Sequence, residues 1–206
     1  MTMILILAAA YLLGSIPFGY LVVKAVKGID VRTQGSGNIG MTNVWRVAGA
    51  PWGILTLALD AAKGVLAVWL GQHFFPTDEL VEVSCGLLAL LGNVFSVFMK
   101  FKGGKGIGVS VGVFFWLLPI PSAVGTLVFA LALFFWRMIS VGSLLAFTTM
   151  MSLTFYFERG LTWLSGLTLV GALVVWWSHR QNIKRILAGT ENKIGSKSKA
   201  KKGKGK

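Results

Sequence analysis

The sequence has few charged residues, and their signs are strongly unbalanced. Only 13% of its 206 residues are charged, with 20 Lys and Arg against 7 Asp and Glu. Soluble domains carry about 25% charged residues. Hydrophobic residues instead make up 55% of the chain, and the mean hydropathy is +0.73. We therefore expect an integral membrane protein.

Cysteine is nearly absent. The single Cys85 lies in an apolar run, so no disulfide can form within the chain. A signal-peptide pattern is missing as well, because the first apolar segment, 3–23, has no basic leader and is longer than a typical signal core. We interpret it as a retained transmembrane helix.

Long apolar runs dominate the rest of the chain. A bilayer-spanning helix needs about 20 residues, and the runs have about that length or are somewhat shorter. The apolar segments are 3–23, 51–71, 80–99, 107–118, 121–136, 139–157 and 161–178. The stretch 107–136 is too long for one span and contains Pro119 and Pro121, so it forms either one kinked helix or a hairpin of two short helices.

The distribution of positive charge favours the hairpin. With a hairpin, the basic residues before and between the spans share one side of the membrane with the C-terminal tail, as the positive-inside rule requires. The opposite loops are then 71–79, which has no Lys or Arg, and 158–160, which has only Arg159. We predict an all-α integral membrane protein with seven transmembrane helices, some of them short, the N-terminus outside and the C-terminus in the cytoplasm.

The C-terminal tail differs in composition from the rest. Seven of the 20 basic residues lie in 193–206, among Gly and Ser. We predict one membrane-embedded domain, 1–192, followed by a disordered lysine-rich cytoplasmic tail, 193–206. The tail either binds the anionic leaflet or only helps to set topology, and this distribution argues against a nucleic-acid partner.

Three glycine-rich polar segments interrupt the apolar chain, and each combines a flexible backbone with nearby positive charge. That combination is typical of phosphate-binding sites. The segments are 35–46, with Ser36, Asn38, Thr42, Asn43 and Arg46; 60–64, with Asp60 and Lys63; and 102–106, with Gly103, Gly104, Lys105 and Gly106.

Each segment also has a simpler structural interpretation. The first segment could be no more than a polar loop that caps the following helix, although an Arg and four polar residues exceed what a cap needs. Asp60 and Lys63 lie on one helical face, either as a packing ion pair or as functional residues, and the sequence leaves this open. The third leads into a helix from Ile107, where free N–H groups and Lys105 would seat an anion better than a hinge would.

Two further motif matches are rejected. The sequence 35–40 fits G-x-G-x-x-G, but a dinucleotide site needs a preceding strand, and a transmembrane helix precedes it here. His73 and Asp78 fit H-x-x-x-x-D, the pair of acyltransferases that use acyl thioesters, but they fall in the loop on the opposite side from the basic segments. Lys105 lacks the spacing of a P-loop.

The ordered segments together resemble the bacterial acyl-phosphate:glycerol-3-phosphate acyltransferases, the PlsY family. Its G-S-G-N-x-G-x-T-N-x-x-R, D-x-x-K-G and F-x-G-G-K-G blocks match 35–46, 60–64 and 101–106. The similarity extends to Ser140, Ser143, His179, Asn182 and Arg185. Two departures stand out: Asn93 replaces the usual His of a G-H pair, and Ile107-Gly108-Val109 replaces Val-Ala-Thr.

The resemblance implies transfer of a fatty acyl group from acyl phosphate to the 1-hydroxyl of glycerol 3-phosphate at the bacterial inner membrane. It implies no metal or organic cofactor, and membrane lipid and the two substrates as partners. An association with the enzyme that produces acyl phosphate is compatible with it. A transporter of an organic phosphate and a lipid-binding scaffold are the alternatives, but the chain has no evident inverted repeat and its polar segments gather on one side.

The site residues follow from the same resemblance. No Ser–His–acid arrangement is evident, so we expect no acyl-enzyme, and the base is either His179 or a substrate phosphate, with the phosphate favoured. From chemistry alone His179 could equally be an interfacial anchor. The expected catalytic residues are Lys105, Ser36, Arg46 and His179; those for glycerol 3-phosphate are Ser36, Asn38, Asn43, Arg46, His179 and Asn182; those for acyl phosphate are Gly103, Gly104, Lys105, Gly106, Ser140 and Ser143.

Overall fold

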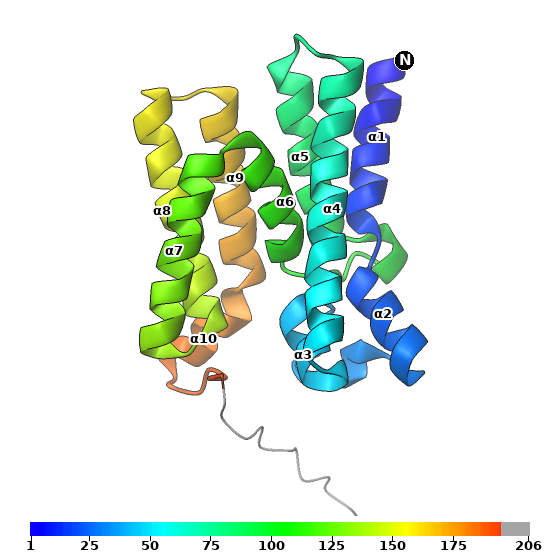
Figure 1. Cartoon of the computed structure of the whole chain (residues 1–206), viewed down its shortest axis with the longest axis vertical. Coiled ribbons are helices and arrows are strands. Elements are labelled where there is room, and N and C mark those ends of the chain that lie inside the picture. Colours follow the sequence, from blue (N-terminus) through cyan, green and yellow to red (C-terminus); the bar gives the residue numbers. More distant parts are fainter. Residues whose placement is uncertain (195–206) are drawn as a thin grey trace, which may run out of the picture.

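The computed structural model describes residues 1–194, and the regular secondary structure in that range is entirely helical (Figure 1). The predicted tail, 193–206, lies outside the described residues from 195 on. The helices are α1 (Thr2–Ser15), α2 (Phe18–Lys27), α3 (Met41–Ala48), α4 (Ala50–Phe74), α5 (Glu79–Val94), α6 (Ile107–Leu117), α7 (Pro119–Trp136), α8 (Ile139–Glu158), α9 (Trp163–Ser178) and α10 (Arg180–Leu187), with single 3-10 turns η1 (Val31–Thr33) and η2 (Val97–Met99).

Within 1–194, five segments are long and apolar enough to cross a membrane. They are Thr2–Lys27, Ala50–Phe74, Glu79–Met99, Pro119–Trp136 and Ile139–Glu158. Two shorter apolar helices, Ile107–Leu117 and Trp163–Ser178, accompany them. Large apolar side chains such as Leu127 and Phe134 are exposed on the outside of the bundle, as expected where lipid is the solvent.

The stretch 107–136 forms two helices, as the charge pattern predicted. α6 ends at Leu117 and α7 begins at Pro119, which lacks the N–H that would continue a helix. The two helices run in opposite directions (Figure 1).

The first apolar segment is broken, which the sequence analysis did not predict. α1 ends at Ser15 and α2 begins at Phe18, because Pro17 cannot donate to the helix ladder. The freed carbonyls both find donors: Ser96 Oγ lies 2.6 Å from the Ser15 oxygen, and Lys63 Nζ lies 2.7 Å from the Ile16 oxygen. The break is therefore fastened to η2 and to α4.

The segment 35–46 is also more ordered than a polar loop. Its second half belongs to α3, Met41–Ala48, and the irregular stretch before this helix is confined to 34–40. Asn38 Oδ1 accepts from the Gly40 N–H at 2.8 Å, which shapes the turn that leads into this helix.

Small residues let the central helices approach closely. A Cβ on Gly112 would lie 1.9 Å from the Ala61 carbonyl oxygen, and one on Gly64 would lie 2.4 Å from that of Val109. α4 and α6 are thus in backbone contact, the usual device for packing helices in lipid. Beyond them Phe114, 1% exposed, fills the core between α6 and α8 and meets the Phe147 ring edge-on at 5.7 Å.

The connections fall at two ends of the bundle (Figure 1). α2, α3, α10 and the α7–α8 connection lie at the lower end, whereas the α4–α5 and α8–α9 connections lie at the upper end. His73 is in the last turn of α4 and stacks on Trp69 at 4.9 Å. The H-x-x-x-x-D match therefore lies at the end opposite the basic segments.

The α4–α6 contact can be tested with two matched substitutions. Gly112→Ala should destabilise the protein by about 1–3 kcal/mol, because its methyl has no space. Gly166→Ala is the control, since nothing lies within 4 Å of its Cβ position and alanine favours a helix. Melting temperatures in detergent should fall for the first variant only; equal melting of both would contradict the close contact.

Candidate active site

The 34–40 turn is held by one buried amide. Asn43 is 1% exposed, and its Oδ1 accepts from the Ser36 N–H at 2.8 Å. Its Nδ2 lies 2.8 Å from the Asn38 carbonyl oxygen and 3.0 Å from that of Gln34. The polar atoms of Asn43 are thus used inside the turn, while Ser36 and Arg46 are exposed beside it.

The glycine turn is built differently from the expectation of free N–H groups. The Gly103 N–H donates to the Val94 carbonyl at 3.0 Å and the Gly104 N–H to the Asn93 carbonyl at 2.9 Å. The Gly106 N–H donates to Asn93 Oδ1 at 3.1 Å. The expectation was wrong for these three groups, because the first two cap carbonyls at the end of α5 and the third binds the Asn93 side chain.

Glycine is required in the turn because α5 is so close. A Cβ on Gly103 would lie 2.0 Å from the Asn93 carbonyl oxygen, and Gly106 has a φ of +84°. The free donors lie one step later: within 1–194, the N–H groups of Ile107, Gly108 and Val109 have no acceptor, as at the start of any helix.

Lys105 lies at the centre of the polar cluster. Its Nζ donates to Asn182 Oδ1, and its carbonyl accepts from Ser178 Oγ at 3.2 Å. Burial lowers the pKa of Lys105 to about 8; Glu191 opposes this, and the cations of Arg185 and Arg46 add to it. Residues from two distant segments, α3 and the C-terminal segment from α10 on, therefore act on one ammonium group.

Glu191 is the acidic member of this cluster, and the sequence analysis missed it. Its carboxylate accepts from Asn182 Nδ2 at 2.7 Å, from Ser140 Oγ at 2.8 Å and from Arg185 Nε at 2.7 Å. Burial opposes its ionisation, but these hydrogen bonds outweigh burial and keep the pKa of Glu191 below its usual value. The only feature of the sequence that could have indicated Glu191 is that it is a lone acidic residue among the basic residues of the C-terminal region.

His179 is buried beside the same lysine, with 2% of its surface exposed. Its Nδ1 lies 2.8 Å from the Val175 carbonyl oxygen. A carbonyl only accepts, so Nδ1 carries the hydrogen and Nε2 is left as an acceptor. Burial and, next, the Lys105 cation lower the pKa of His179 to about 4, so the ring is neutral at pH 7.

A family model described as "Glycerol-3-phosphate acyltransferase" matches residues 4–189 of the chain. The chain belongs to this family. Relatives called glycerol-3-phosphate acyltransferase include one from Geotalea daltonii, 42% identical over 92% of this chain and 96% of its own length. Another, from Geobacter metallireducens, is 46% identical over 93% and 97%.

Two solved structures share the fold of this acyltransferase. They are crystal structures of PlsY (YgiH), an integral membrane glycerol 3-phosphate acyltransferase, in its glycerol 3-phosphate and lysophosphatidic acid forms. The TM-scores are 0.87 and 0.85, with 35% identity over 95% of this chain and 96% of the other. The chain is accordingly an integral membrane glycerol-3-phosphate acyltransferase.

The acyltransferase brings together only part of the predicted set. Lys105, Asn182 and Ser140 are joined directly or through Glu191. The 34–40 turn, which leads into the α3 helix of Arg46, lies beside the glycine turn, with Ile39 Cγ1 3.7 Å from the Cβ position of Gly104. The Ser143 hydroxyl instead bonds the Ile139 carbonyl of its own helix at 3.0 Å.

The Asp60–Lys63 pair of the acyltransferase now has a structural explanation. The two charged groups are 2.8 Å apart, and both residues are buried. Lys63 also holds the Ile16 carbonyl, and a Cβ on Gly108 would lie 3.1 Å from Asp60 Oδ2, so the carboxylate adjoins the first turn of α6. The pair ties α4 to the broken first span and to the helix that follows the glycine turn.

Glu191→Gln should lower the melting temperature at pH 7 by roughly 5 °C, since charge-assisted hydrogen bonds are lost. The folded-state pKa of Glu191 is lowered, so its stabilising effect is fully present above the ordinary carboxylate pKa and is lost as pH falls through the lowered, folded-state value. The difference from the unsubstituted protein should therefore shrink as pH falls below about 4. Glu158→Gln is the control; a constant difference across pH would contradict the assignment.

Proposed function

We propose that this acyltransferase moves a fatty acyl group from acyl phosphate to the 1-hydroxyl of glycerol 3-phosphate, releasing lysophosphatidic acid and inorganic phosphate. One observation carries the proposal: Lys105, Asn182, Arg185 and the neutral His179 converge, with Arg46 of α3 alongside. Two phosphate groups repel each other, so a reaction between phosphate-bearing substrates needs such a dense positive field.

Acyl phosphate would be held by Lys105 and the first turn of α6. The free N–H groups at Ile107 and Gly108 and the positive end of the helix suit its phosphate. Gly103, Gly104 and Gly106 then act through the shape of the turn rather than as donors. Ser140 supports the seat through Glu191.

Glycerol 3-phosphate would bind between the two polar loops. Arg46 offers a bidentate fork for its phosphate, with the exposed Ser36 and the half-buried Asn38 beside it. His179 and Asn182 would meet its hydroxyl groups from the other side. The matched PlsY structure in its glycerol 3-phosphate form, at 35% identity, supports a site for this substrate in the fold.

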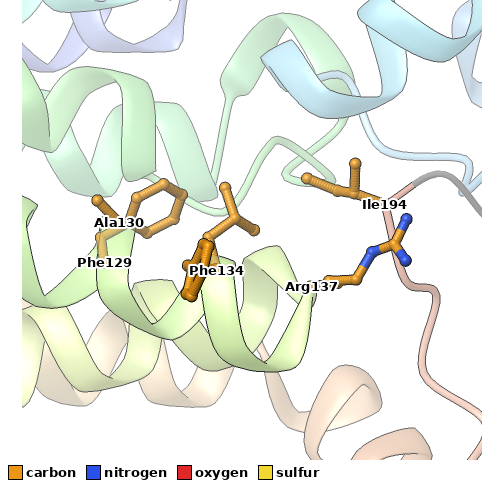
Figure 2. A pocket seen from close by; sticks show the side chains of 6 residues that line it. Phe129, Ala130, Phe134, Arg137 and Ile194 are labelled. Carbon is orange, nitrogen blue, oxygen red and sulfur yellow. The ribbon is translucent and has the colours of Figure 1, made fainter.

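The acyl chain would lie in a shallow apolar hollow on α7. The hollow has a volume of about 490 Å³ and is lined by Phe129, Ala130, Leu133, Phe134, Arg137 and Ile194. Figure 2 shows Arg137 and Ile194 together at one end, with Phe129 and Ala130 at the other. The Ile194 N–H donates to the Arg137 carbonyl at 2.7 Å, so this end continues into the segment that carries Glu191.

The chemistry is a direct transfer. The glycerol 1-hydroxyl oxygen attacks the acyl carbonyl carbon, a new ester C–O bond forms, and the bond from that carbon to the phosphate oxygen breaks. The hydroxyl proton goes to the departing phosphate. Positioning by the fixed loops supplies much of the acceleration, because acyl phosphate is already activated.

The membrane orientation is part of the proposal. We infer seven crossings, with the short α6 and α9 among them, the N-terminus outside and the C-terminus in the cytoplasm. Charge supports this, because Lys24, Lys27 and Lys102 fall at the end that carries the site and only Arg159 falls in the opposite connections.

Lys105→Ala should reduce phosphate release from acyl phosphate plus glycerol 3-phosphate at least about 100-fold, since a fixed charge-stabilising group is removed. The assay uses purified protein in detergent, and unchanged melting shows that it is folded. Lys27→Ala, at an exposed position on α2, is the matched control and should retain activity. Full activity of the Lys105 variant would disprove the donor site.

The pH dependence should follow the same lysine. With a pKa of about 8, Lys105 is cationic below that pH and neutral above it. The kcat/KM for acyl phosphate, which reports the free enzyme, should be level between pH 6 and 7 and fall as pH rises through about 8. Lys105→Arg should move this fall beyond pH 9, because arginine keeps its charge. An unshifted fall in that variant would assign it to another group.

A further inference from the structure

We propose that Asn93 is a positioning residue for Lys105, acting through the glycine turn. The inference rests on the donor site proposed above. Asn93 is 5% exposed and lies in the last turn of α5. None of its atoms is required to touch substrate.

Asn93 binds the turn on both sides of Lys105. Its carbonyl oxygen accepts from the Gly104 N–H at 2.9 Å, and its Oδ1 accepts from the Gly106 N–H at 3.1 Å. The residues before and after Lys105 are therefore tied to one amino acid. A backbone held at both neighbours leaves Lys105 little freedom to rotate.

The position of Asn93 is itself fixed by close contacts. A Cβ on Gly92 would lie 2.2 Å from the Tyr11 carbonyl oxygen, so the end of α5 is pressed against α1. Tyr11 OH donates to the Phe95 carbonyl at 2.7 Å, on the other side of Asn93. The end of α5 is thereby locked before the turn begins.

The glycines of the turn fit this amide closely. A Cβ on Gly104 would lie 2.9 Å from Asn93 Oδ1, and one on Gly103 would lie 2.0 Å from the Asn93 carbonyl oxygen. The turn therefore wraps around Asn93, and the side-chain oxygen sets the point at which the chain leaves for α6. On the far side Lys105 Nζ reaches Asn182, and the Lys105 carbonyl reaches Ser178.

Asn93→Leu tests the role, because leucine fills a similar volume without an acceptor. Hydrogen exchange in the 101–107 peptide should become about tenfold faster, as the Gly106 N–H loses its buried partner. The KM for acyl phosphate should rise about tenfold, while that for glycerol 3-phosphate stays within about twofold.

Two variants serve as controls. Asn93→Asp keeps an oxygen opposite the Gly106 N–H, so hydrogen exchange should remain slow. In high salt, where the added charge is screened, the KM of this variant for acyl phosphate should lie within about threefold of the KM of the unsubstituted protein. Thr154→Val removes a buried hydroxyl that bonds the Met150 carbonyl at 2.8 Å, far along α8, and should change neither KM.

Unchanged exchange in Asn93→Leu would overturn the inference. Faster exchange with both KM values unchanged, or with both raised equally, would also overturn it, because Asn93 would then have only a structural effect. That outcome would not affect the proposed reaction. An unaltered KM for acyl phosphate in Lys105→Ala would instead disprove the proposed donor site itself, whatever the result for Asn93.

Discussion

Backbone groups released where a membrane helix breaks must find partners inside the protein, and the structure depends on how this requirement is met. At the first break, the carbonyls of Ser15 and Ile16 are held by Ser96 and Lys63. At the second, the glycine turn returns its N–H groups to the end of α5. Both breaks are thus connected to fixed helices, so irregular backbone can carry the site without being loose.

Charge imposes the next condition. Burial is the main cause of the lowered pKa of Lys105, and the nearby cations of Arg185 and Arg46 lower it further. Bringing these cations together raises the electrostatic free energy of the folded protein. Glu191 offsets part of this repulsion and also orders Ser140 and Asn182. A single carboxylate leaves the cluster strongly positive, which the proposed reaction between two phosphate-bearing substrates requires.

Much of the fold follows from local features of the sequence. Apolar length predicted the helices, and the prolines with the charge distribution predicted the α6–α7 hairpin. What the sequence hides depends on distant partners. Glu191 accepts a hydrogen bond from a serine 51 positions away. Asn43 was predicted to bind substrate but is used inside its own turn, because an amide group suits both roles. The glycines likewise indicated phosphate, whereas contact with Asn93 is what demands them.

The state of His179 bears on where the glycerol proton goes under the proposed reaction. Its Nδ1–H is held by Val175, so Nε2 can accept a hydrogen bond from a substrate hydroxyl. Its pKa of about 4 makes it a poor proton acceptor at pH 7. A departing phosphate is the stronger base and lies on the scissile bond itself. Under the proposed reaction His179 would therefore orient the hydroxyl, while the proton would leave with the phosphate. Burial and, next, the neighbouring Lys105 cation weaken the histidine as a base, and Lys105 is also the charge proposed to hold the donor.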